Sequence, residues 1–188
     1  MTGDSLMSAP TPDISVDAFR AAMSQLGAPV VVVTTDGQEG RHGLTVSAVC
    51  SVSDTPPTLL VCLNRSNRSY AAFAGNRVLG FNILGEGDQA LAAAFASSRL
   101  QPEERFSHGT WHQAVTGAPL LDGAVVSLDC TVEAVHVSGT HDVLMCHVKA
   151  IRHGADDIDV LTWFDRRFHV LPRTKTMKRP GFSGGSYL

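Results

Sequence analysis

Short apolar runs separated by turn-forming residues follow one another along most of the chain. The continuous apolar run at 29–35 predicts a buried strand, and the Asp-Gly and Glu-Gly pairs within 36–40 mark a turn after it. Apolar and polar residues alternate over 125–135 and 142–151, which predicts two long strands with one face toward the core. Further strands are expected at 42–53, 58–63, 78–84 and 160–164.

Helical signals are fewer and shorter. Ser15 is expected to cap a helix over 16–26, which Gly27 ends, with its apolar side chains on one face. Shorter helices are expected at 70–74 and 88–98, while 100–117 is predicted to be irregular. About seven strands at hairpin spacing with a few short helices predict a mainly β fold, an antiparallel barrel with helical additions.

The two ends of the chain differ in composition from its middle. Residues 1–13 are rich in Pro, Ser and Thr, and residues 172–188 mix basic residues with Gly, Ser and Pro. We expect the first segment to be flexible and the second to be either flexible or an arm that closes over a partner subunit. No linker or repeat interrupts 14–171, which is predicted to form one domain.

Composition narrows the functional classes. Of 188 residues, 44% are hydrophobic and 18% charged, and the formal net charge of −3 gives no reason to expect binding to nucleic acid or to a membrane. Residues 1–13 lack a basic start followed by an apolar run, so we expect neither a signal peptide nor a membrane span there. Four cysteines without a CxxC pair lie in apolar runs and are expected to be buried, reduced thiols, consistent with the cytoplasm: Cys50, Cys62, Cys130 and Cys146.

Several common catalytic motifs are absent from the sequence. There is neither a GxGxxG dinucleotide fingerprint nor a GxxxxGK[ST] phosphate loop. The eight histidines form no HxH or HExxH pattern, so no metal site is predicted. The neighbours Cys146 and His147 point to opposite faces of a strand, which argues against a catalytic pair.

Small hydroxylated residues instead mark two candidate binding segments. The predicted strand at 42–53 carries hydroxyls and backbone donors suited to a flat ring with polar edges, such as a flavin: Thr45, Ser47, Ser51 and Ser53. The segment at 64–69 follows a strand and opens a helix, where backbone N–H groups with Ser and Arg side chains suit a phosphate. The residues alone fit a polar turn with a helix cap equally well.

Two further segments have less specific patterns. Gly139 allows a tight turn that places His141 at the mouth of a hairpin, where a solitary histidine is usually just exposed. Residues 163–169 form a charged turn flanked by aromatic side chains.

Three stretches in this order resemble the short-chain NAD(P)H:flavin reductases, the reductase components of two-component flavin-dependent monooxygenases. They are 43–66 (GLTVSAVCSVSDTPPTLLVCLNRS), 139–142 (GTHD) and 164–169 (FDRRFH). The resemblance covers roughly 16–171. It implies a split β-barrel, a homodimer with flavin near the subunit interface, and oxidation of NADH or NADPH with reduction of FMN or FAD. The reduced flavin then diffuses to a partner monooxygenase.

The resemblance also implies roles for residues of this sequence. The isoalloxazine ring is expected to lie along Thr45, Val46, Ser47 and Ala48, with Ser51 and Ser53 on the same wall. The phosphate is expected at Asn64, Arg65, Ser66 and Ser69, and Phe106 near the flavin tail. The nicotinamide side is expected to be formed by His141 as the catalytic-site residue, with Arg166, Phe168 and His169. Two residues depart from the family pattern: Asn67 stands where a second serine is common, and Phe168 where tyrosine is common.

Two other functions remain open at this stage. A split barrel can also bind flavin or haem without turning over NADH, as a binding module. A pyridoxamine-phosphate-oxidase-like activity needs a basic pocket for a second phosphate, for which the sequence offers only Arg65, Arg68 and Arg105. The sequence does not separate FMN from FAD, or NADH from NADPH.

Overall fold

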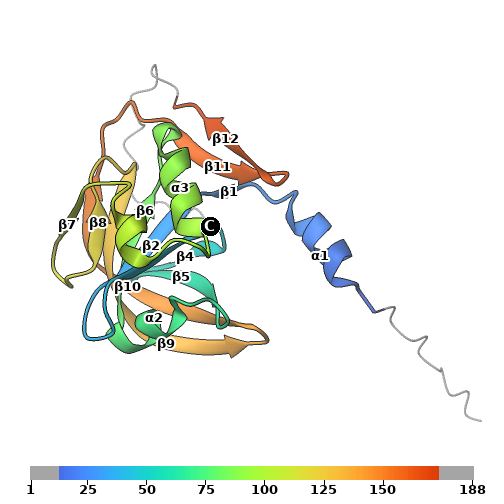
Figure 1. The fold of residues 1–188 in the computed structure, drawn as a ribbon, viewed down its shortest axis with the longest axis horizontal. Helices are drawn as coiled ribbons and strands as arrows, with labels where there is room; N and C mark the ends of the chain where they lie inside the picture. Colours follow the sequence, from blue (N-terminus) through green and yellow to red (C-terminus); the bar gives the residue numbers. More distant parts are fainter. Residues whose placement is uncertain (1–12, 174–188) are drawn as a thin grey trace, which may run out of the picture.

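The computed structural model describes residues 13–173, and its largest element is a seven-stranded antiparallel sheet (Figure 1). The strand order is β3-β2-β6-β9-β10-β5-β4. The strands are β2 (Val31–Thr35), β3 (His42–Val46), β4 (Val49–Asp54), β5 (Pro57–Asn64), β6 (Val78–Ile83), β9 (Val126–Ser138) and β10 (His141–His153). The predicted mainly β fold is confirmed.

The sheet closes into a barrel at Ser47 and Ala48. These two residues connect β3 to β4, which are the opposite edges of the sheet, so the sheet has to curl until its edges meet. The Cys62 N–H donates to the Ala48 carbonyl at 3.0 Å and seals the corner. The single strand predicted at 42–53 is therefore wrong: the chain turns a corner in its middle, and the two halves pair with different strands.

The apolar run on β2 is buried on both of its faces. Val31 and Val33 face the barrel interior, where they pack with Phe73, Leu79 and other core residues. Val30, just before the strand, and Val32 belong to a second core. This second core contains residues of α3 (Gln89–Ala96) and β11 (Val160–Phe164). A strand covered on both sides explains the unbroken valine sequence.

Smaller elements surround the barrel. Strands β1 (Ala28–Pro29), β11 and β12 (Arg167–Leu171) form a three-stranded sheet, and β7 (Trp111–Gln113) pairs with β8 (Pro119–Leu121). The short helices are α2 (Tyr70–Asn76), η1 (Glu86–Asp88) and α4 (Pro102–Phe106). The expectation of an irregular 100–117 segment is wrong, because a proline at the first turn of α4 and a Gln101–Glu104 capping box support a helix there.

Helix α1 (Val16–Met23) stands apart from the barrel (Figure 1). The Ser15 hydroxyl caps it as predicted, accepting from the Ala18 N–H at 3.1 Å, but the helix ends at Met23. None of its residues is buried. The segments predicted to be flexible, 1–13 and 172–188, lie almost entirely outside the described residues.

The cysteines are not all buried as expected. Cys130 and Cys146 are fully buried in the barrel, and burial raises the pKa of Cys146 to about 12 and that of Cys130 further. Cys62 is half-buried and Cys50 is exposed. The prediction fails at Cys50 because β4 is an edge strand that no other element of the described chain covers.

Candidate functional site

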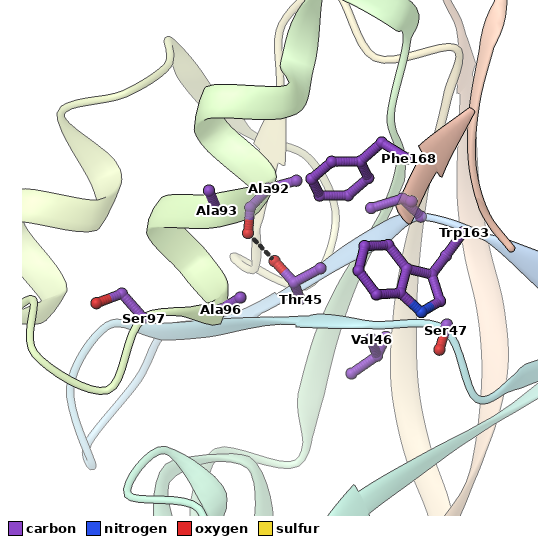
Figure 2. A pocket seen from close by; sticks show the side chains of 10 residues that line it. Thr45, Val46, Ser47, Ala92, Ala93, Ala96, Ser97, Trp163 and Phe168 are labelled. Carbon is purple, nitrogen blue, oxygen red and sulfur yellow. Dashed lines mark hydrogen bonds between the residues drawn. The ribbon is translucent and has the colours of Figure 1, made fainter. Parts of the chain in front are cut away.

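A pocket of about 460 Å³ opens between β3, α3 and the β11–β12 hairpin (Figure 2). Its lining combines the end of a strand, one stripe of an alanine-rich helix and two aromatic rings: Val30, Thr45, Val46, Ser47, Ala92, Ala93, Ala96, Ser97, Trp163 and Phe168. The alanines let a ligand come close to the helix. The pocket therefore has the shape and apolar character that a planar ring system requires.

Two aromatic side chains form the side of the pocket that faces α3. Trp163 and Phe168 are directly paired across β11 and β12, so both lie on the same face of the hairpin. Their rings meet edge to face, with centroids 5.0 Å apart. Figure 2 shows both rings at the cavity across from the alanines of α3. This pair provides a rigid apolar wall.

The hydroxyls along β3 have different tasks. The Thr45 hydroxyl donates to the Ala92 carbonyl at 2.7 Å and holds α3 against the strand (Figure 2). The Ser47 hydroxyl has no hydrogen-bond partner among the described residues, and it lies at the exposed end of the pocket. Ser47 is therefore the hydroxyl of this wall that is free to bind a ligand.

A second, polar pocket of about 340 Å³ adjoins the first one. The two share Ala96 and Ser97 at the C-terminal end of α3. The second pocket is lined by Asn64, Ser66, Asn67, Arg68, Phe95, Ala96, Ser97, Ser98 and Arg105. An apolar slot thus continues into a hydrogen-bonding chamber.

Two arginines of the polar pocket have no carboxylate partner among the described residues. Arg105 is only 5% exposed, donates to the carbonyls of Gly43 (2.8 Å) and Ser97 (2.7 Å), and leaves its buried Nε without a partner. Burial, and then the positive charge of Arg68, lower the pKa of Arg105. A buried cation beside a second cation is costly, and the chamber therefore offers a ligand positive charge and one unpartnered N–H donor.

The loop that carries the polar residues is fixed by its own side chains. Asn64 Oδ1 accepts from the backbone N–H (2.9 Å) and the hydroxyl (2.8 Å) of Ser66. Asn67 Oδ1 accepts from the Ser69 N–H at 2.9 Å just before α2. These two local turns are of the kind that asparagine favours, and they hold the loop without help from a ligand.

The structure brings together six of the predicted site residues. Thr45, Val46, Ser47 and Phe168 line the apolar pocket, and Asn64 and Ser66 line the polar one. Ala48 lies at the barrel corner next to Ser47. Ser51 and Ser53 lie beyond this corner on the exposed edge strand β4, where the Ser53 hydroxyl donates to the Thr55 carbonyl at 3.1 Å. They line neither pocket of the single chain.

Other predicted residues have structural partners instead. The Arg65 guanidinium donates to the Gly139 carbonyl and lies 3.7 Å from Asp142 Oδ1, so it ties the 64–69 loop to the neighbouring turn. Ser69 is buried under the loop, with its hydroxyl between Arg105 and the Gly43 carbonyl, both at 3.5 Å.

Phe106 is a core residue. Its ring packs against Phe95 and Trp111, with centroid distances of 5.1 and 4.9 Å. Phe95 lines the polar pocket, so Phe106 lies one layer behind that wall.

The residues expected on the nicotinamide side lie on two separate turns. His141 is exposed at the start of β10, opposite Asn64 of β5, with Nδ1 2.9 Å from the Thr140 hydroxyl. Arg166 has a left-handed backbone in the β11–β12 turn, with φ of 60°. His169 lies beside Phe164, with Nε2 3.2 Å from the Phe164 carbonyl. Of His141, Arg166 and His169, only His141 is paired in register with a residue of either pocket, whereas Phe168 itself lines the first pocket.

Sequence reasoning missed a large part of the site. The alanine stripe of α3 and Trp163 were not assigned to it. Arg68 belongs to the 64–69 segment expected to bind a phosphate but was not named as a site residue, and Arg105 was considered only for a different activity. The available signals were an alanine run within a short helix and, for Arg68 alone, the lack of an acidic neighbour in sequence, because Arg105 directly follows Glu103 and Glu104. Neither signal is specific, because pairing of an arginine is decided by tertiary contacts.

Two other kinds of site are not found within 13–173. No three His, Cys, Asp or Glu side chains of this range gather where they could hold a metal ion. No helix of this range has the length and apolar character needed to cross a membrane.

The split barrel with an apolar slot and an adjoining anion chamber is typical of flavin-binding reductases. The chain belongs to the family described as flavin reductase like domain, whose model matches residues 23–172. The resemblance seen in the sequence is thereby confirmed.

Individual relatives fall within the same class. The FMN reductase (NADH) RutF of Cronobacter sakazakii is 54% identical over 156 residues, which are 83% of this chain and 93% of that protein. A candidate flavin reductase from Haemophilus somnus 129PT has a solved structure with a TM-score of 0.81 and 43% identity, covering 84% of this chain and all of that one. The styrene monooxygenase flavin reductase of Pseudomonas putida S12 has a TM-score of 0.72 and 28% identity, covering 83% and 99%.

Proposed function

We propose that this protein is an NADH-dependent FMN reductase that releases reduced flavin to a partner flavin-dependent monooxygenase. The observation that carries this proposal is the apolar slot that continues into a chamber with two arginines lacking carboxylate partners among the described residues. FMN has this division into a planar ring and a phosphate dianion. The relatives described as FMN reductases (NADH) support the same activity.

Each part of the site has a defined role in this proposal. The alanines of α3 and the Trp163–Phe168 pair, which line the pocket, would hold the ring, and the end of β3 would border it. The phosphate lies at the 64–68 loop, where Arg105 Nε and Arg68 supply positive charge. When bound there, the flavin accepts a hydride from NADH. Neither an acid nor a base from the protein is required, and its residues bind, orient and exclude water.

His141 is proposed to orient the nicotinamide amide. Its exposed ring lies next in register to Asn64 of the polar pocket, so it stands at the rim and outside the ring slot. His141 lines neither pocket, so it is left free to contact the second substrate. The His141→Ala variant is therefore expected to raise the KM for NADH several-fold, because it removes about one hydrogen bond to the nicotinamide. The affinity for FMN should change little. Unchanged NADH kinetics in steady-state assays would contradict this role.

A homodimer is proposed because large apolar side chains remain exposed in the single chain. Helix α1 presents Phe19 (57% exposed) and Met23 (47%) without burying any residue, and Leu26, three residues after the helix, is 65% exposed. Val52 on the uncovered edge strand β4 is 46% exposed. A second copy of the chain that packs on α1 and β4 would bury these residues, and it would also bring another surface to Ser51 and Ser53.

Sedimentation or light scattering is expected to give twice the 20.0 kDa mass of one chain. Phe19→Glu, in the apolar face of α1, should shift the protein toward the monomer by placing a charge in the interface. Ala21→Glu serves as the control, because two residues along a helix turn the side chain by about 200°. A wild-type monomer, or equal effects of both variants, would contradict this dimer.

The activity is tested by NADH oxidation with FMN, under air and with a flavin-dependent monooxygenase as acceptor. Turnover that depends on added FMN is expected, together with product formation by the oxygenase when the two proteins are physically separated by a membrane permeable to flavin. A protein that binds FMN without oxidising NADH would instead be a binding module, the alternative that the sequence left open. The reaction is proposed to take place in the cytoplasm, where NADH is supplied.

A further inference from the structure

A third, smaller pocket adjoins the polar pocket, which we call the anion chamber. It measures about 170 Å³, half the volume of the chamber, and is lined by His42, Arg68, Ser69, Leu100, Gln101, Pro102 and Arg105. Arg68 and Arg105 line both cavities. The two guanidinium groups therefore lie at the boundary between the anion chamber and the third pocket.

The segment 97–101 is held at this boundary by the same two arginines. Arg68 Nη2 donates to the carbonyls of Ser98 and Leu100, the latter at 3.3 Å. Arg105 Nη2 donates to the Ser97 carbonyl at 2.7 Å. Hydrogen bonds to three carbonyls of this segment thus hold the short connection that leaves α3 and leads to α4. We call this connection, residues 97–101 with its Arg68 and Arg105 contacts, the arginine latch.

We propose that the arginine latch makes the protein select FMN over FAD. The inference rests on the proposed function, because it concerns the far end of the same flavin site. FMN ends in a phosphate monoester, which the chamber of about 340 Å³ accommodates. FAD continues through a second phosphate into an adenosine that is larger than the ribityl phosphate. The third pocket, on the other side of Arg68 and Arg105, has only half the volume of the anion chamber.

Displacing the arginine latch costs free energy, and this cost lowers the affinity for FAD but not for FMN. To pass it, the adenosine diphosphate half has to separate Arg68 from the carbonyls of Ser98 and Leu100, and each of these charge-assisted bonds is stronger than a neutral one. Arg68 is itself exposed, so its side chain is the member of the latch that moves most easily. Arg105 is buried and stays in place. Arg68 is therefore the specificity-determining residue.

The test compares KM values for FMN, FAD and riboflavin in the wild type and two variants at Arg68. The wild type is expected to prefer FMN to FAD. Arg68→Ala is expected to raise the KM for FMN about tenfold, because one charge-assisted contact to the phosphate is lost, while the KM for FAD falls. Riboflavin lacks a phosphate, so the wild type and the Arg68→Ala variant should have the same KM for it.

Arg68→Lys is the matched variant, because lysine keeps the positive charge and lacks the planar fork that bridges two carbonyls. It is expected to keep most of the FMN affinity and to accept FAD better than the wild type. Hydrogen exchange provides a readout without flavin: amides of 97–101 should exchange faster in both variants, with α3 unchanged.

The opposite sign of the FMN and FAD effects is the decisive feature. If the KM values for FMN and FAD rise together in both variants, Arg68 is a phosphate ligand only and the latch is refuted. Equal use of FMN and FAD by the wild type would also refute it. A protein that oxidises no NADH with any flavin would instead contradict the proposed function.

Discussion

The Ala96→Leu variant is expected to lose FMN affinity by about 10- to 100-fold, the effect of forcing a bulky group into a fitted space. Ala96 lines both the ring slot and the anion chamber, so a leucine there fills the passage through which the flavin has to extend. The wild-type side chain is exposed at the last residue of α3, and leucine is a good helix former. Folding should therefore be unaffected while binding is blocked.

Titration with FMN, followed by quenching of Trp163 fluorescence, measures this loss, and thermal unfolding checks the fold. Ala90→Leu is the control, because it makes the same change on an exposed position of the same helix outside both pockets. Wild-type FMN affinity in the Ala96→Leu variant would mean that the flavin does not pass this point. Equal losses of FMN affinity in both variants would mean that the substitutions disturb α3 as a whole and do not block one passage.

Replacing Arg105 with alanine is expected to weaken FMN binding by about 10- to 100-fold, because a charge-assisted contact to the phosphate is worth about 1.5–3 kcal/mol. Riboflavin binding should change much less, since riboflavin offers no phosphate to the buried Nε. The variant also loses hydrogen bonds to Gly43 and Ser97, so its melting temperature should fall. The ratio of the FMN and riboflavin effects separates the two roles of the side chain.

Arg105→Lys provides the matched comparison for charge. It keeps a cation in the chamber but cannot donate to Gly43, Ser97 and a phosphate in one plane. An intermediate FMN affinity is expected, with riboflavin again near the wild-type value. If FMN and riboflavin lose the same factor in both variants, the arginine supports the fold only, and the phosphate has to lie elsewhere.

The sequence predicted those parts of the fold and site that depend on local patterns. The valine run of β2, the alternation along β9 and β10, and the Ser15 cap are each decided by neighbouring residues. The 64–69 segment was also identified, because Asn64 and Asn67 fold it through contacts two residues away. The interpretation of this segment as a polar turn before a helix describes the structure. Its interpretation as a phosphate-binding segment stays a prediction.

The rest of the site depends on contacts between distant residues. Arg105 reaches the polar pocket from α4, and nothing near it in the sequence shows that it lacks an acidic partner. The hydroxyls of 42–53 look equivalent along the chain, yet the corner at Ser47 and Ala48 leaves Thr45 in the ring slot and sends Ser51 and Ser53 to the opposite edge of the sheet. Phe106 was expected near the flavin tail from the resemblance. Its position behind Phe95 depends on the packing of α3 against α4, which the sequence does not show.

A crystal structure of the protein with bound FMN tests the central claim most directly. We predict that the ring lies between Trp163 and Phe168 on one side and the alanines of α3 on the other, with the phosphate within hydrogen-bonding distance of Arg105 Nε and the 64–68 loop. A flavin found along Ser51 and Ser53, or a phosphate pointing to solvent with Arg105 Nε still unpartnered, would contradict this account.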